Sequence, residues 1–133
     1  FTEPELARVG LMEQEAREKY GNDIRVVKQE YADVDRAQAD GTTAGFAKII
    51  TKRNGQILGA HLVGAAAGEL IHEIILAMSH NLKLSALSGI HIYPTLSEVN
   101  SKAAFAQTRQ NYEQNHRLQQ MLSSIFRVIR RFG

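Results

Sequence analysis

Two apolar runs joined by a short turn constrain this chain more than any other feature. Residues 45–51 and 57–63 are rich in β-branched and aliphatic side chains, and the linker between them contains Asn54-Gly55. Asn-Gly is a strong signal for a tight hairpin, because both residues tolerate the positive φ angles that such turns need. We therefore expect an antiparallel β-hairpin at the centre of the fold.

The segments before the hairpin predict a helix, a strand and a loop. A short helix is expected from Leu11 to Tyr20, where Gly21-Asn22 ends it. The run from Ile24 to Tyr31 has strand propensity, and the polar stretch 33–41 is expected to be a surface loop. Strands paired through a tight turn, with helices before and after them, indicate an α+β domain with an antiparallel sheet flanked by helices.

Residues 68–79, after the hairpin, predict a helix with one broad apolar face. The stripe consists of Leu70, Ile71, Ile74, Ile75 and Met78. Such a face is typical of a core or an interface helix, and since a monomer of this size seldom leaves such a stripe exposed, we expect a symmetric dimer in which it meets a second copy. A short helix at 83–88, an extended segment at 89–94 and a helix at 96–108 follow.

Glycine spacing and composition exclude several classes of site. Gly59, Gly64 and Gly68 do not form a G-x-G-x-x-G loop, and their spacing suits close packing at the start of the helix. The chain has no cysteine, so it holds no disulfide or thiolate site, and its histidines lack metal-ligand spacing; no metal site is expected. Without a signal-like or membrane-spanning run, a cytoplasmic domain is expected.

Positive charge is concentrated at the C-terminal end of the chain. Residues 1–108 carry 11 Lys+Arg against 13 Asp+Glu, whereas residues 109–133 carry 5 against 1. Because the body is mildly acidic, nucleic-acid binding is not expected. From Leu118 onward the spacing of apolar residues predicts an amphipathic helix. This basic extension, 109–133, is expected either to dock on the dimer or its twofold mate, or to bind an anionic membrane surface through 118–133.

Four blocks, in order, resemble the C-terminal dimerisation domain of the class I pyridine nucleotide-disulfide oxidoreductases, the group of dihydrolipoamide dehydrogenase and mercuric reductase. The blocks are residues 1–11, 45–49, 57–64 with 68–71, and 93–98. The resemblance implies that residues 1–108 form a homodimeric interface domain of an FAD- and NAD(P)-dependent enzyme. It also implies that the two nucleotide-binding domains lie before Phe1, so this chain alone is expected to bind no flavin and to be inactive.

The last block carries the chemistry in this family. A histidine directly before the Pro-Thr pair reaches the partner's redox disulfide and moves protons, and a glutamate five positions after it holds the ring. Here Tyr93 stands at the histidine position, while Pro94 and Glu98 match the family. The resemblance further implies a cis Tyr93-Pro94 bond, with both residues contacting the partner's FAD.

Tyrosine at this position changes the expected chemistry. A phenol with a pKa of about 10 is a poor base at neutral pH. The arrangement resembles that of soluble transhydrogenases and some mercuric-reductase-like proteins, which do not need the histidine for a dithiol. His91 is either a substitute proton carrier, sharing a face with Tyr93, or an interface hydrogen-bonding residue. Glu98 either holds a catalytic ring or completes a capping box with Thr95.

Two other functional classes fit the same residues. One is a stand-alone homodimeric binding module, and the other is a small enzyme that uses Tyr93, His91 and Glu98 by themselves. An FAD-type G-x-G-x-x-G and a C-x4-C before Phe1 in the parent gene would support the oxidoreductase reading, and an initiator Met next to Phe1 would favour the others. The parent's substrate, and its choice of NADH or NADPH, depend on segments outside this sequence.

Overall fold

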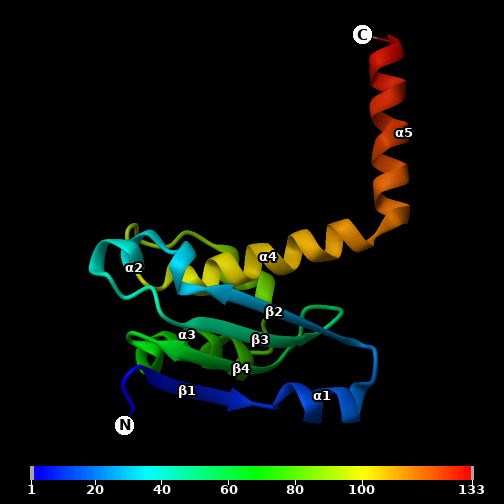
Figure 1. Cartoon of the computed structure of the whole chain (residues 1–133). Coiled ribbons are helices and arrows are strands. Elements are labelled where there is room, and N and C mark those ends of the chain that lie inside the picture. The colour runs from blue at the N-terminus through cyan, green and yellow to red at the C-terminus, as the bar shows by residue number, and fades with distance from the viewer. Residues whose placement is uncertain (1, 133) are drawn as a thin grey trace.

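The computed structural model describes residues 2–132 and has the predicted α+β architecture (Figure 1). Four strands form one antiparallel sheet in the order β1-β4-β3-β2. The strands are β1 (Glu5–Gly10), β2 (Ile24–Glu30), β3 (Phe46–Lys52) and β4 (Ile57–Gly64). The helices are α1 (Glu13–Tyr20), α2 (Asp35–Asp40), α3 (Ala67–Ser79), α4 (Glu98–Gln114) and α5 (His116–Phe132), with 3-10 turns at Tyr31–Asp33 and Leu84–Ser88.

The hairpin forms as the Asn-Gly signal predicts. β3 pairs with β4, and the turn closes where the Lys52 amide donates to the Gln56 carbonyl at 2.8 Å. Gly55 has a φ of 93°, a conformation that side chains disfavour. The predicted strand after Ile24 is β2, and it pairs with the outer side of β3. β1 was not predicted as a strand, and it pairs with β4 on the other side.

Alternation along the strands gives the sheet two different faces. The main core lies on one face, where Ile49 and Leu62 of the sheet meet Ile74 of α3 and Val99 of α4. A smaller cluster on the other face packs Ala16 of α1 against Ile50 and Leu58. One face is therefore closed by α3 and α4, while α1 covers only part of the other.

The apolar stripe of α3 does not face outward: α3 is a core helix, and the prediction that this stripe meets a second copy is wrong. Ile71 and Ile74 are buried in the chain's own core, and Leu70, Ile75 and Met78 pack partly buried against that core. The stripe points inward because α3 lies across β4 and β1 and provides much of the cover for the sheet. The exposed apolar residue of α3 is instead Leu76.

The polar stretch 33–41 is also more ordered than predicted. It contains α2, and both Val34 and Ala37 are fully buried. Val34, the extended residue just before the helix, and Ala37, in its first turn, both pack into the main core. Gly41, in the left-handed conformation with φ of 70°, ends this helix.

The C-terminal region forms two helices that meet at Asn115. α4 runs past residue 108 to Gln114, so the proposed boundary at 108 falls inside a helix. The Asn115 side chain then accepts a hydrogen bond from the Leu118 amide at 3.1 Å and caps α5. α5 turns away from α4 and projects from the body (Figure 1). Within residues 2–132 no helix has the length and apolar character needed to cross a bilayer.

Candidate functional site

The segment from Gly89 to Ser97 carries the residues singled out by the sequence. It links the second 3-10 turn to α4, without regular secondary structure in place of the extended run that was predicted. The Tyr93-Pro94 bond is cis, as expected from the family resemblance. Ile90 is fully exposed, and Ile92 and Tyr93 are 78% and 65% exposed. The segment therefore presents apolar surface at the edge of the domain.

Tyr93 directs its phenol to α2 rather than to the other candidate residues. The hydroxyl donates to Asp35 Oδ2 at 2.8 Å. The hydrogen bond to Asp35, together with the carboxylate charge, raises the pKa of Tyr93 above its usual value of 10.0. The phenol therefore stays protonated at neutral pH and acts here as a donor, not as a base.

His91 is held by an ordered set of acceptors on α3 and its own segment. Its Nε2 lies 2.7 Å from Glu73 Oε1, and its Nδ1 lies 2.9 Å from the Gly89 carbonyl oxygen. Glu73 is oriented in turn by Asn100, a fully buried residue of α4 whose Nδ2 donates to Glu73 Oε2 at 2.8 Å. Since both ring nitrogens face acceptors, the doubly protonated imidazolium suits this position best.

The electrostatics of His91 agree with that geometry. Burial lowers the pKa of His91, but the hydrogen bonds to Gly89 and Glu73, aided by the charges of Glu73 and Glu98, outweigh it and raise the pKa above 6.5. The side chain of His91 is only 13% exposed, and both nitrogens are engaged. This geometry favours a residue that anchors the segment over one that delivers a proton outside the domain.

Replacing His91 with Asn should destabilise the domain in a pH-dependent way. Because the folded-state pKa is raised above the unfolded value, the ion pair contributes fully below about pH 6.5 and is lost as pH rises through the folded pKa. We expect the free energy of unfolding to fall by about 1.5 kcal/mol at pH 5.5, and this difference to shrink toward zero at high pH. Urea unfolding at several pH values measures this difference.

His80 supplies a matched control for that series. It is exposed at the C-terminal end of α3, so His80→Asn should leave the free energy of unfolding nearly unchanged at every pH. A difference between wild type and His91→Asn that is the same at low and high pH would contradict the imidazolium anchor.

Glu98 begins α4, but it does not form the predicted capping box. The helix starts after Ser97, and the Thr95 hydroxyl donates to the Ile92 carbonyl oxygen at 2.6 Å instead of capping the helix. The hydroxyl is diverted because the chain makes a turn at 92–95 just before the helix. Within residues 2–132 Glu98 Oε2 is buried and makes no hydrogen bond. Glu98 therefore keeps an acceptor oxygen that its neighbours do not satisfy.

The three candidate residues come together only in part. His91 and Tyr93 do not share one partner: the first reaches α3 and the second reaches α2. Sequence reasoning missed Asp35, Glu73 and Asn100, the residues that hold them. Glu73 carried a weak signal in the His72-Glu73 pair, but nothing in the local sequence linked it to His91 eighteen positions away.

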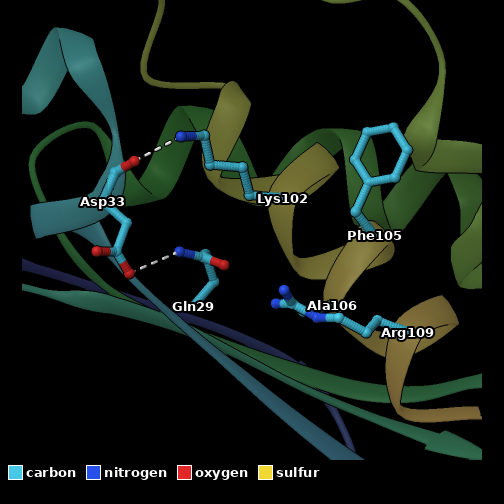
Figure 2. A pocket seen from close by; sticks show the side chains of 6 residues that line it. All are labelled: Gln29, Asp33, Lys102, Phe105, Ala106 and Arg109. Atoms are coloured by element: carbon cyan, nitrogen blue, oxygen red, sulfur yellow. Dashed lines mark hydrogen bonds between the residues drawn. The ribbon is translucent and has the colours of Figure 1, made fainter. Parts of the chain in front are cut away.

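A separate hollow lies between α4 and the end of β2 (Figure 2). It has a volume of about 430 Å³ and is lined by Gln29, Asp33, Lys102, Phe105, Ala106 and Arg109. Gln29 donates to the Asp33 carboxylate at 3.2 Å, and the Lys102 ammonium donates to the Asp33 carbonyl. These contacts fasten the turn after β2 to α4, and none of the candidate residues lines this hollow.

The fold and the exposed segment together define a class of protein. The four-stranded antiparallel sheet, covered on one face by two helices, superimposes on part of a solved flavoprotein disulfide reductase, and the segment that follows the sheet reads Tyr-Pro-Thr-x-x-Glu. The chain belongs to the family described as the pyridine nucleotide-disulphide oxidoreductase dimerisation domain, which matches residues 1–104.

Relatives of known sequence and structure agree with this assignment. The chain is 40% identical over 107 residues to dihydrolipoyl dehydrogenase of Corynebacterium glutamicum, covering 78% of this chain and 23% of that protein. It is 43% identical over 102 residues to mycothione reductase of Mycobacterium tuberculosis, covering 74% and 22%. The HOCl-induced flavoprotein disulfide reductase of Escherichia coli superimposes with a TM-score of 0.72 at 34% identity, over 77% and 24%. The chain thus spans less than a quarter of these relatives.

Proposed function

We propose that residues 1–108 form the dimer interface of an FAD-dependent NAD(P)H:disulfide oxidoreductase and complete the flavin site of the partner subunit. The observation that supports this most is the family match over residues 1–104, in a chain that covers only 23% of a dihydrolipoyl dehydrogenase. In this proposal the remaining part of the parent protein supplies the FAD- and NAD(P)-binding domains. Residues 109–133 then form an extension that begins within α4 and continues as α5.

The exposed Tyr93-Pro94 pair fits a contact with a flavin rather than a complete binding site. Ile92, Tyr93 and Pro94 form an exposed, mainly apolar surface suited to a flat ring carried by another subunit. When bound, FAD would supply hydride and electron transfer. The residues of this chain would position and shield that group, while the protonated phenol of Tyr93 keeps the segment attached to Asp35.

The tyrosine at position 93 supports a proposal about the chemistry of the parent. Because the Tyr93 phenol stays protonated, we propose a parent whose turnover needs no histidine base here, such as a transhydrogenase-type flavoenzyme. In this proposal three residues set the shape and charge of the interface: Tyr93, Glu98 and His91, which is held by Glu73. Relatives named for disulfide reduction favour the alternative that the parent retains disulfide chemistry by another proton carrier.

The stand-alone binding module is the second functional class, and the parent gene distinguishes the two. An FAD-type G-x-G-x-x-G and a C-x4-C encoded before Phe1, with yellow full-length protein after purification, would support the oxidoreductase. A start codon next to Phe1 would refute it. We further propose a cytoplasmic location and two partners, namely a second copy of this chain and an anionic membrane surface that contacts α5.

Self-association should depend on the exposed isoleucines of the 89–97 segment. We expect the chain to be a dimer at tens of micromolar, and Ile90→Asp with Ile92→Asp to weaken dimerisation at least tenfold, because two carboxylates would be buried against apolar surface. Sedimentation equilibrium measures the dimer dissociation constants of the wild type and of the double variant.

Leu6→Asp is the matched control for this variant. Leu6 is 62% exposed on β1, the edge strand farthest from β2, so the same chemical change there should leave the dimer constant within about twofold. A wild-type chain that remains monomeric at these concentrations would overturn the interface assignment.

A further inference from the structure

Apolar and polar residues lie on almost completely separate faces of α5. At about 100° per residue, the apolar side chains from Leu118 to Ile129 occupy an arc of roughly 160°, and all the polar ones lie on the remainder. Five of the apolar side chains are 46–60% exposed: Met121, Ile125, Phe126, Val128 and Ile129. The domain itself leaves this face open, since α5 contacts the body mainly through α4 and projects away from it (Figure 1).

Charge on α5 has a single sign. The helix carries four arginines, Arg117, Arg127, Arg130 and Arg131, and no aspartate or glutamate. On the helical wheel Arg117 and Arg130 lie near the two edges of the apolar arc, and Arg127 and Arg131 lie on the polar face. Such edge arginines can extend their stems along an apolar layer while the guanidinium groups reach phosphate.

Pairing with a second α5 explains these features less well. A two-helix seam needs only the narrow stripe formed by Leu118, Leu122, Ile125 and Ile129. Met121, Phe126 and Val128 would then stay exposed beside the seam. With that stripe at the a and d positions, none of the four arginines occupies a flanking e or g position, so no interhelical salt bridge would orient or stabilise the pair.

We propose that α5 lies in the plane of an anionic lipid surface, with the Met121, Ile125 and Val128 face in the acyl boundary and the arginines at the headgroups. The broad apolar arc supplies the insertion energy, and the four positive charges select anionic over neutral lipid. This partner is independent of the flavin and dimer functions proposed above, because α5 lies outside the family match at 1–104. In a dimer, two such helices would bind the same surface and increase the apparent affinity.

Phe126→Trp provides a direct reporter in the complete chain, which contains no tryptophan of its own. Vesicles of phosphatidylcholine with roughly 30% phosphatidylserine should shift its emission to the blue, and pure phosphatidylcholine should do so far less. Raising salt from roughly 0.05 M to 0.5 M should release the chain. In that background Arg127→Gln, Arg130→Gln and Arg131→Gln should weaken binding about fivefold each, or about a hundredfold together.

Removal of three charges from the body is the matched control. Lys19→Gln, Arg36→Gln and Lys83→Gln change the same net charge at exposed positions outside α5, so binding should stay within about threefold of wild type. Equal binding to neutral and anionic vesicles would overturn the proposal. A second result would also overturn it: the chain binds no vesicle at low salt, and removal of residues 116–133 changes only the oligomeric state. That result would show that the apolar face of α5 contacts another copy of the chain.

Discussion

Tyr93→His in the full-length protein should raise the turnover of a small dithiol substrate by roughly 10²- to 10⁴-fold, in a parent that carries a redox-active disulfide. Tyr93 cannot serve as the base, because its phenol donates to Asp35 and has a raised pKa. An imidazole titrates near neutral pH and can both accept and return the proton that disulfide exchange requires.

Glu98 should make this gain possible. Its buried Oε2 lacks a partner within residues 2–132, and its charge acts on Tyr93, so it is available to orient a ring introduced at position 93. Steady-state kcat/KM with NADH or NADPH measures the gain, and Tyr93→His combined with Glu98→Gln should lose most of it. Tyr93→Phe is the matched control and should stay within about twofold of wild type. A large loss on Tyr93→Phe would show that the phenol itself takes part in the reaction.

Gly59→Ala should destabilise the domain by about 3 kcal/mol or more. A Cβ at Gly59 would overlap the backbone carbonyl of Leu11, which crosses β4 at this point. The crossing is fixed from both sides, since the Leu11 amide donates to the Leu58 carbonyl at 2.9 Å and His61 Nε2 lies 3.2 Å from the Leu11 oxygen. Backbone atoms cannot yield as a flexible side chain would.

Gly89→Ala adds the same methyl group where space is open. Gly89 has a φ of −64°, and the nearest atom to an added Cβ is 3.8 Å away. The free energy of unfolding of Gly89→Ala should therefore differ from that of the wild type by no more than about 0.5 kcal/mol. Urea titration of both variants measures the contrast. Equal stability of Gly59→Ala and wild type would show that the approach of Leu11 to β4 is not maintained in solution.

Close packing at the glycines is found along β4 and, less tightly, at the start of α3. Gly59 is close to the Leu11 backbone, and a Cβ at Gly64 would press on the ring of Tyr31. These two contacts lie along β4, and Gly68 at the start of α3, where close packing was expected, would place a Cβ 3.3 Å from Glu5 Oε2. The spacing of glycines indicated that something approaches closely, but the identity of the approaching group depends on how distant segments cross the sheet.

Local patterns were sufficient wherever a few neighbouring residues control the backbone. The Asn-Gly turn predicted the β3–β4 hairpin, Gly21 ended α1, and the spacing of apolar residues after Leu118 predicted α5. The ordered blocks from 1–11 to 93–98 were enough to indicate the family, because they include residues of β1, β3 and β4 and of the exposed segment. Each of these features is encoded within a short stretch of sequence.

Only the tertiary structure decided which surfaces are free and which polar groups meet. The sequence predicted the apolar stripe on α3 but could not show that the sheet covers it. It also predicted α5 but could not show that the described domain leaves the apolar face of this helix uncovered. The anchor of His91 joins Glu73 of α3 to Asn100 of α4, and Tyr93 meets Asp35 from 58 positions earlier. Hydrogen bonds of this kind depend on distances set by helix packing, and residue spacing along the chain does not encode those distances.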